Sequence, residues 1–226
     1  MVPKRKLTEV VIARLSVYNR VLGELEEEGI DIVSSEELGV RAGGNAAQTR
    51  KDLSYFGEFG ETGKGYYVKD LQDAISRILG VDKRWNVALV GVGHLGSALL
   101  SYPGFKESGF NIVAVFDNDL RKIGKRWEDI TIQDISELQT TVKEKDIRIG
   151  IMTVPGTVAQ EIADALVAGS IRAIVNFAPA RINVPAGVEV RNADLSTELE
   201  CLSYFLTNEA MVRTGDVKKQ GPDKGA

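Results

Sequence analysis

Apolar residues near the start of the chain recur at the spacing of a helix face. They stand at steps of four, three, four and three, at Val11, Leu15, Tyr18, Leu22 and Leu25. This spacing predicts a helix with one buried face, since residues three and four apart lie on the same side of a helix. Gly29 follows the last of them and is placed to cap the C-terminal end of the helix.

Two N-terminal capping patterns follow this helix. Ser34 precedes Glu37 by three residues, and Asn45 precedes Gln48 by the same spacing. In such pairs the first side chain accepts a hydrogen bond from the backbone of the second. The first pair predicts a short helix, and the second predicts a helix over residues 46–56 that Gly57 closes. Three helices with a short turn between the second and the third are typical of a helix-turn-helix.

The third predicted helix has an inward and an outward face. Thr49, Leu53 and Phe56 lie on the inward face, and polar side chains lie on the other. Arg and Gln make bidentate contacts with base edges, whereas Lys, Ser and Tyr commonly contact phosphates. The candidate DNA-binding residues in and before this helix are Ser34, Gln48, Arg50, Lys51, Ser54 and Tyr55. The alternative is a plain helical bundle with a solvated polar face.

A glycine-rich segment follows the third helix. Residues 56–68 have the sequence FGEFGETGKGYYV, which predicts two short strands around a glycine-rich tip. Lys64 lies where such a wing reaches the minor groove or the DNA backbone, so it joins the candidate DNA-binding residues. The N-terminal part is therefore predicted to be an all-α, winged-helix domain.

The pattern changes near residue 85, where apolar β-branched runs begin to alternate with helical segments. Strands are predicted at 86–90, 111–116, 147–153, 171–177 and 188–192, and helices at 135–144 and 158–168. This alternation is typical of a doubly wound parallel sheet of the α/β class. We therefore expect a DNA-binding domain over residues 1–82, a dinucleotide-binding domain over 83–213 that includes a terminal helix, and a disordered tail over 214–226.

The first strand of the second domain runs into a glycine motif. Gly91, Val92, Gly93, His94, Leu95 and Gly96 spell G-x-G-x-x-G, and a helix begins directly afterwards. In this context the glycines allow a tight turn, close approach to a pyrophosphate and close packing of helix and strand. Asp117 ends the next strand, where a carboxylate accepts ribose hydroxyls and repels a 2′-phosphate, so the cofactor prediction is NADH and NAD⁺. The alternative is a glycine turn in an α/β domain without a ligand.

Two further strand ends are candidates for the nicotinamide half of the site. They are Thr153, Val154 and Pro155, and Asn176, Phe177, Ala178 and Pro179. Ligands bind at the carboxyl ends of parallel strands in this class of fold. The mostly apolar side chains favour the neutral dihydronicotinamide ring over its cationic form, because burying an unpaired charge is costly. Ordinary loop turns are the alternative.

Composition excludes several other classes of protein. The chain has 226 residues, one cysteine and one histidine, so an internal disulfide and a zinc site are not expected. No run of 18 apolar residues and no apolar stretch after the basic N-terminus are present, so neither a membrane span nor a signal peptide is expected. These features favour the cytoplasm. The net charge of −4 means that any DNA binding depends on local charge.

An enzyme is the main alternative function. A hydride-transfer enzyme needs a positioned acid or base and a substrate-binding region, but His94 lies inside the phosphate loop and no second lobe follows. We therefore predict that the chain is not an enzyme, with a small NAD-dependent oxidoreductase as the alternative. The last predicted helix, over 196–212, carries an apolar stripe that either packs on its own sheet or docks on a partner chain. Cys201 is expected to be a core residue of this helix.

Several segments in order along the chain resemble the redox-sensing transcriptional repressor family Rex. They are RKDLSYFG at 50–57, GKGY at 63–66, GVGHLG at 91–96, LSYPGF at 100–105, NFAP at 176–179 and DLSTEL at 194–199. The resemblance covers about residues 7–206. It implies a homodimer of winged-helix and Rossmann domains with the C-terminal helix swapped between subunits. It also implies a repressor that binds operator DNA when NADH is scarce and leaves it when NADH binds.

The resemblance also implies a polar triad that steadies the DNA-competent dimer, formed by Arg14, Tyr102 and the partner's Asp194. Two departures from the family pattern are visible. Thr49 stands where the family usually has valine, which puts a hydroxyl on the inward face of the third helix. Gly43 and Gly44 precede Asn45 and add backbone freedom before that helix, so operator preference is expected to differ.

Overall fold

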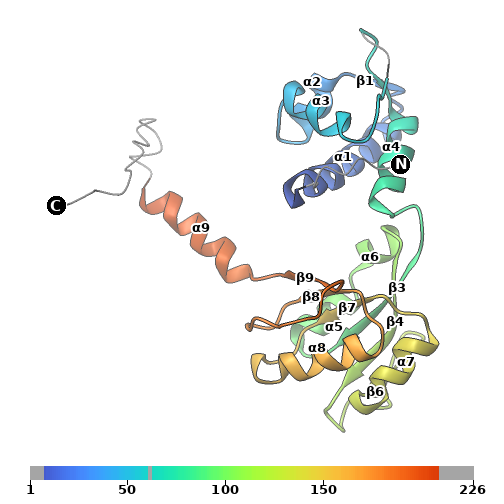
Figure 1. The fold of residues 1–226 in the computed structure, drawn as a ribbon, viewed down its shortest axis with the longest axis vertical. Coiled ribbons are helices and arrows are strands. Elements are labelled where there is room, and N and C mark those ends of the chain that lie inside the picture. Colours follow the sequence, from blue (N-terminus) through green and yellow to red (C-terminus); the bar gives the residue numbers. More distant parts are fainter. Residues whose placement is uncertain (1–7, 61–62, 209–226) are drawn as a thin grey trace, which may run out of the picture. The chain divides into compact units, whose positions relative to one another are not determined.

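The structure is a computed structural model that describes residues 8–60 and 63–208 (Figure 1). The chain forms two compact units. One holds the chain up to Arg84 together with Gly104–Phe110, and the other holds Trp85–Pro103 and the chain from Asn111 onward. The end of the helix predicted over 196–212 and the tail predicted from 214 lie outside the described residues.

The first unit is built around helix α1. Its elements are α1 (Glu9–Glu27), β1 (Ile32–Val33), α2 (Ser35–Arg41), α3 (Ala46–Ser54), β2 (Tyr66–Tyr67) and α4 (Val68–Leu79). All five apolar positions of the predicted α1 face are buried. Gly29 follows α1 with φ of 75°, the left-handed conformation that glycine adopts most readily. Helix α4 was not predicted, yet it buries Val68, Leu71 and Ile75 in the same core as α1.

Both predicted N-terminal caps form. The Ser34 hydroxyl accepts from the Glu37 backbone N–H at 3.0 Å, and the Asn45 side-chain oxygen accepts from the Gln48 N–H at 3.0 Å. Helix α3 ends at Ser54, two residues earlier than predicted. The N–H groups of Tyr55 and Phe56 donate three residues back, a tightening that is common at the last turn of a helix.

The tip of the predicted wing hairpin includes residues 61 and 62, which lie outside the described residues. Strand β2 pairs antiparallel with β1, with Val33 opposite Tyr66, and Gly65 before it forms a β-bridge, whereas residues 57–60 contain no strand. A Cβ at Gly65 would lie 2.5 Å from the Val33 carbonyl oxygen, so glycine allows the wing backbone to approach β1. The segment before the tip instead packs Phe59 against the core of the unit.

The second unit contains a seven-stranded sheet in the order β5-β6-β4-β3-β7-β8-β9. Its strands are β3 (Trp85–Val90), β4 (Phe110–Asp117), β5 (Arg126–Trp127), β6 (Ile130–Asp134), β7 (Ile149–Met152), β8 (Ala173–Asn176) and β9 (Glu189–Asn192). The pairs β3–β7, β7–β8, β8–β9 and β4–β6 are parallel, and β5–β6 is antiparallel. The predicted doubly wound parallel sheet is therefore confirmed, although β5 and β6 were not predicted.

Helices connect these strands, and a last helix follows β9. They are α5 (His94–Leu100), α6 (Pro103–Glu107), η1 (Ile135–Glu137), α7 (Leu138–Glu144), η2 (Gly156–Val158), α8 (Ala159–Ala168) and α9 (Leu195–Thr207). The order reverses at β3, because β4 lies on one side of it and β7 on the other. In open α/β sheets this switch point is where ligands bind, and the glycine motif begins there.

Helix α9 differs from the other long helices because none of its residues is buried. Leu195, Leu199, Leu202 and Phe205 are each more than half exposed. Packing of this helix on its own sheet, one of the two expectations, is therefore not observed in the single chain. Cys201 is also exposed, so its predicted role as a core residue is wrong here.

Candidate nucleic-acid interface and dinucleotide site

The outward face of α3 carries the predicted polar side chains. Arg50, Lys51 and Ser54 are exposed, whereas Tyr55 and Gln48 are half-buried. The inward residues Thr49 and Leu53 are buried, as the helical pattern predicted. The Thr49 hydroxyl donates to the Asn45 carbonyl oxygen at 3.0 Å, so this buried hydroxyl is satisfied by the cap residue of α3.

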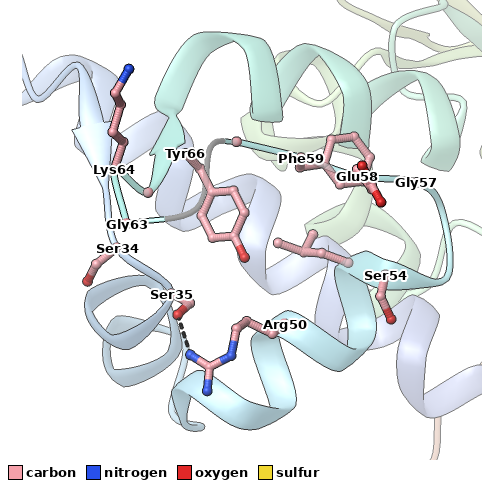
Figure 2. A pocket seen from close by; sticks show the side chains of 13 residues that line it. Ser34, Ser35, Arg50, Ser54, Gly57, Glu58, Phe59, Gly63, Lys64 and Tyr66 are labelled. Carbon is pink, nitrogen blue, oxygen red and sulfur yellow. Dashed lines mark hydrogen bonds between the residues drawn. The ribbon is translucent and has the colours of Figure 1, made fainter.

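A polar groove lies between α2, α3 and the wing (Figure 2). It has a volume of about 650 Å³ and brings together four predicted residues, Ser34, Arg50, Ser54 and Lys64. Gln48, Lys51 and Tyr55 do not line it. Ser35 and Tyr66 also line it, and these two were not predicted. The only sequence signals for them are a second serine at the start of α2 and an aromatic residue directly after the last glycine of the wing.

Arg50 is held across this groove. Its Nη1 donates to the Ser35 hydroxyl at 2.7 Å, and Figure 2 shows the Tyr66 hydroxyl pointing towards the same side of the groove. Burial raises the pKa of Tyr66 although the Arg50 charge opposes this shift. The guanidinium is therefore directed toward the start of α2.

The inward face of α3 carries a buried carboxylate that sequence reasoning missed. Asp52 is fully buried and accepts from Arg14 Nε at 2.5 Å and Nη2 at 2.8 Å. The Tyr18 hydroxyl donates to it at 3.0 Å and Gln48 Nε2 at 2.7 Å. Burial raises the pKa of Asp52, but the bonds from Arg14, Gln48 and Tyr18 together lower it below its usual value. The carboxylate therefore ties α3 to α1.

This contact bears on the triad that the resemblance implies. In the single chain Arg14 forms its ion pair with Asp52, and the hydrogen bond from Arg14 to that carboxylate raises the pKa of Arg14. Asp194 caps α9 by accepting from the Ser196 N–H at 2.9 Å, and Tyr102 is exposed. The triad concerns a dimer, so it stays a prediction.

The glycine turn of the second unit has the geometry of a phosphate loop. Gly91 has φ of 96°, and a Cβ at Gly96 would lie 1.9 Å from the Gly91 carbonyl oxygen. Neither position accepts a larger residue without movement of the backbone. At Gly93, by contrast, a Cβ would meet no atom within 4 Å, so this side of the turn is open. An open face at the middle glycine is what close approach of a pyrophosphate requires.

Asp117 lies beside this turn but is largely engaged by the chain itself. Its carboxylate accepts from the Val92 N–H at 2.7 Å, from Lys122 Nζ at 2.9 Å and from the Asp119 N–H at 2.8 Å. Burial raises the pKa of Asp117, but these three bonds outweigh it and lower the pKa. A carboxylate offers about four acceptor positions, so about one remains for a ribose hydroxyl. Asp117 therefore also fixes the glycine turn, which the sequence did not indicate.

The other strand ends divide into structural and open residues. The Thr153 hydroxyl donates to the Gly91 carbonyl oxygen at 2.6 Å, and Val154 is buried in the core of the unit. The Asn176 amide donates to the Ala180 carbonyl and to Asn192 Oδ1, and its oxygen accepts from the Ala178 N–H. These contacts shape the two loops, and the predicted contact of these residues with a nucleotide stays a prediction.

A hollow of about 910 Å³ lies at the ends of β8 and β9. Leu95 and the predicted residues Asn176, Phe177, Ala178 and Pro179 line it, whereas Thr153, Val154 and Pro155 do not. Arg181, Asp194 and Glu198 also line it, so the hollow is more polar than the apolar pocket that was expected. His94 is exposed at the first position of α5, and Val92 is buried in the turn.

No group of three or more His, Cys, Asp or Glu side chains that could hold a metal ion occurs within 8–60 and 63–208. In the same residues no helix is both long enough and apolar enough to span a bilayer.

The two units together define a class of protein. A helix-turn-helix with an exposed cationic helix is joined in one chain to a parallel sheet with a phosphate-binding turn, which is the plan of a transcription regulator that responds to a nucleotide. Family models agree with this division. Residues 6–54 match the family described as "Putative DNA-binding protein N-terminus", and residues 82–180 match the "CoA binding domain".

Full-length relatives identify the family. The chain is 51% identical over 201 residues to the redox-sensing transcriptional repressor Rex of Desulforamulus reducens, covering 89% of this chain and 96% of that protein. It is 49% identical over 204 residues to Rex of Carboxydothermus hydrogenoformans, covering 90% and 98%. The chain therefore belongs to the Rex family of redox-sensing transcriptional repressors.

Solved structures support the same assignment. The crystal structure of RSP in complex with β-NAD⁺ and operator DNA matches with a TM-score of 0.87 and 37% identity, covering 95% of this chain and all of that one. The crystal structure of RSP in complex with β-NADH matches with a TM-score of 0.83 and 36% identity, covering 93% and 99%.

Proposed function

We propose that this chain represses transcription by binding operator DNA as a homodimer and that NADH releases it from the DNA. One observation carries the proposal: the exposed, cationic face of α3 and the open glycine turn at Gly93 belong to the same chain. Relatives named as redox-sensing repressors and a related structure with operator DNA support it. The nucleotide would thus control the helix-turn-helix.

The DNA-binding surface would combine base and phosphate contacts. Gln48 lies in the first turn of α3, the part of a recognition helix that reaches base edges in the major groove. Lys51 is exposed, and Arg50 is held beside Ser35 and Tyr66 in the polar groove. Cations and hydroxyls in such a groove suit phosphate oxygens, which position the protein without reading sequence.

The nucleotide site would be built from the glycine turn and the loops after β7 and β8. The pyrophosphate would approach Gly93, Asp117 would accept one adenosine ribose hydroxyl, and Phe177, Ala178 and Pro179 would contact the nicotinamide. The bound nucleotide supplies a ring that is cationic when oxidised and neutral when reduced. The apolar side chains on the Phe177 side of the hollow would favour the neutral ring, since desolvating a cation is costly.

We also propose that the nucleotide is a signal and not a hydride donor, and that the protein acts in the cytoplasm, where DNA and NADH meet. His94 is exposed on the glycine turn, so it is not set in an enclosed site where an acid would act on a substrate. The relatives that cover the whole chain are named as repressors.

A second copy of the chain would cover α9. Its apolar side chains are exposed in the single chain, and exposed apolar patches of this kind mark interaction surfaces. The first unit carries an apolar hollow of about 650 Å³ lined by residues that include Ile12, Phe56 and Ile78. We propose that the partner's α9 docks there, which agrees with the swapped helix implied by the resemblance.

The test is capture of sheared genomic DNA on the purified protein without nucleotide, with NAD⁺ and with NADH. We expect a palindromic motif that is retained without nucleotide or with NAD⁺ and lost with NADH. Retention of no motif under any condition would refute DNA recognition. Retention of the same motif with NADH would refute the redox control alone.

A further inference from the structure

The buried carboxylate Asp52 does more than join two helices, because it determines how a neighbouring amide is oriented. Each of its two oxygens accepts two hydrogen bonds. Oδ2 is bonded to Arg14 Nε and the Tyr18 hydroxyl, and Oδ1 is bonded to Arg14 Nη2 and Gln48 Nε2. With about four acceptor positions on a carboxylate, this one is saturated.

An ionised carboxylate accepts hydrogen bonds and donates none. Its low pKa keeps Asp52 ionised near neutral pH. The Gln48 carboxamide must therefore turn its NH₂ group toward Asp52, at 2.7 Å, and its oxygen away from it. A flipped amide would place oxygen against oxygen in a buried site, an unfavourable contact. One orientation of Gln48 is thus strongly preferred.

Gln48 occupies the third position of α3, where its backbone N–H is capped by Asn45. Both ends of this residue are therefore fixed, the backbone by Asn45 and the side chain by Asp52. Its side chain is half-buried, so part of the carboxamide still faces solvent. Apart from the N–H that is bonded to Asp52, the carboxamide retains both acceptor positions of Oε1 and one N–H of Nε2.

In the major groove, a base amino group donates a hydrogen bond and a base carbonyl group accepts one, so each needs the opposite kind of partner from the protein. Adenine and cytosine present an amino donor, whereas guanine and thymine present a carbonyl acceptor. An outward glutamine oxygen accepts from an amino group. If the amide were free to flip, its NH₂ group would contact a carbonyl equally well.

We propose that Asp52 is a positioning residue that fixes the Gln48 carboxamide with its oxygen turned away from Asp52, so that α3 reads the amino group of adenine or cytosine in preference to the carbonyl of guanine or thymine. This inference rests on the proposed DNA-binding function. It assigns to a buried ion pair a part in operator specificity in addition to its part in holding α3 against α1.

The first experiment finds the base pair that Gln48 reads. The wild-type protein and Gln48→Ala each select duplexes from a randomised library, and we expect the variant to lose preference at one position of each half-site. Failure of the wild type to select any motif would count against the proposed function as a whole. A wild-type motif that Gln48→Ala leaves unchanged would overturn only the present inference.

The second experiment removes single groups from that base pair. The amino group is removed with purine in place of adenine or pyrimidin-2-one in place of cytosine. The carbonyl is removed with 2-aminopurine in place of guanine or 5-methylpyrimidin-2-one in place of thymine. We define the amino-specific ratio as the factor by which loss of the amino group weakens wild-type binding, divided by the factor by which it weakens binding of Gln48→Ala. This ratio should be at least about five, the lower end of what one base contact contributes. Because pairing defects affect both proteins equally, the ratio isolates the contact of Gln48.

Loss of the carbonyl should weaken the two proteins by the same factor. If carbonyl removal, and not amino removal, separates the wild type from Gln48→Ala, the amide points the other way and the proposal is wrong. This comparison requires no change at Asp52, so it holds even where a variant at Asp52 fails to fold.

The third experiment separates positioning from stability. Asp52→Asn replaces an acceptor with a group that also donates, so the Gln48 amide is free to flip and the amino-specific ratio should fall to about one. Tyr18→Phe is the matched control, because it removes a bond to Oδ2 and leaves the bond between Oδ1 and Gln48 in place. We expect both variants to unfold at lower urea concentrations, but only Asp52→Asn to lose the ratio. Equal loss in both variants would show a merely structural role.

Discussion

Two glycines of the phosphate-binding turn should respond to the same substitution in opposite ways. At Gly93 an added Cβ meets no protein atom within 4 Å, whereas at Gly96 it would lie 1.9 Å from the Gly91 carbonyl oxygen and 2.9 Å from the Thr153 hydroxyl. The backbone of Gly93 is extended, with φ of −80° and ψ of −164°, which alanine adopts without strain. Alanine substitution at each of the two glycines therefore distinguishes an effect on nucleotide binding from an effect on folding.

We expect Gly93→Ala to retain the stability of the wild type or to exceed it slightly, because replacing glycine at a compatible position stabilises by about 0.4–1 kcal/mol. Its methyl group would occupy the space that a pyrophosphate needs. A loss of about 1.4 kcal/mol in binding corresponds to tenfold weaker affinity, and we expect at least about that loss for NADH. Operator binding should persist, and its release should need at least about tenfold more NADH.

We expect Gly96→Ala to lose both properties. A contact of this kind with a backbone atom forces the turn to move, and overpacking of this type costs about 1–3 kcal/mol or more. Urea unfolding followed by circular dichroism gives the stability, and titration of nicotinamide fluorescence gives the affinity for NADH. Wild-type NADH affinity in Gly93→Ala would refute the placement of the pyrophosphate, and wild-type stability in Gly96→Ala would refute the packing described at this turn.

Three further predictions follow from other residues. Lys51→Ala should weaken binding to all duplexes and reduce the salt slope by about one, since one phosphate contact is lost; an unchanged slope in salt titrations would contradict this role. Leu202→Asp should disfavour the homodimer by placing a charge on the exposed apolar face of α9, and sedimentation at several concentrations would show monomer where the wild type is dimeric; an unchanged dimer would exclude α9 from the interface. Folding lowers the pKa of the Asp117 carboxyl group. The ionised carboxylate therefore stabilises the folded protein above about pH 3.9, the pKa of an unfolded aspartate. This stabilisation is lost as the pH falls through the lower pKa that Asp117 has in the folded protein. Urea midpoints measured from pH 7 downward should therefore fall less steeply on the acid side in Asp117→Asn than in the wild type, and equal slopes would contradict the assignment.

Local sequence rules predicted much of the fold. The buried face of α1, the caps at Ser34 and Asn45 and the glycine turn after β3 each depend on residues a few positions apart. Such short-range spacing is visible in sequence because it follows the geometry of one helix turn or one strand end.

Features that depend on distant partners were missed or misassigned. Strand β2 pairs with β1 more than 30 residues earlier, and nothing in the glycine-rich segment specifies that partner. The engagement of Arg50 by Ser35 and of Asp52 by Arg14 likewise joins residues 15 and 38 positions apart. Asp117, predicted only as a ribose ligand, also holds Val92 and Lys122, because a carboxylate at a strand end accepts from whichever donors the fold brings to it.

NADH and operator DNA are expected to oppose each other's binding to the same protein. The most direct measurement is the affinity of the full chain for its operator with and without NADH, together with its affinity for NADH with and without operator. We expect each ligand to weaken the other by the same factor, within about 5- to 150-fold, because coupling between two sites is reciprocal. Operator affinity that does not change at saturating NADH would contradict the account.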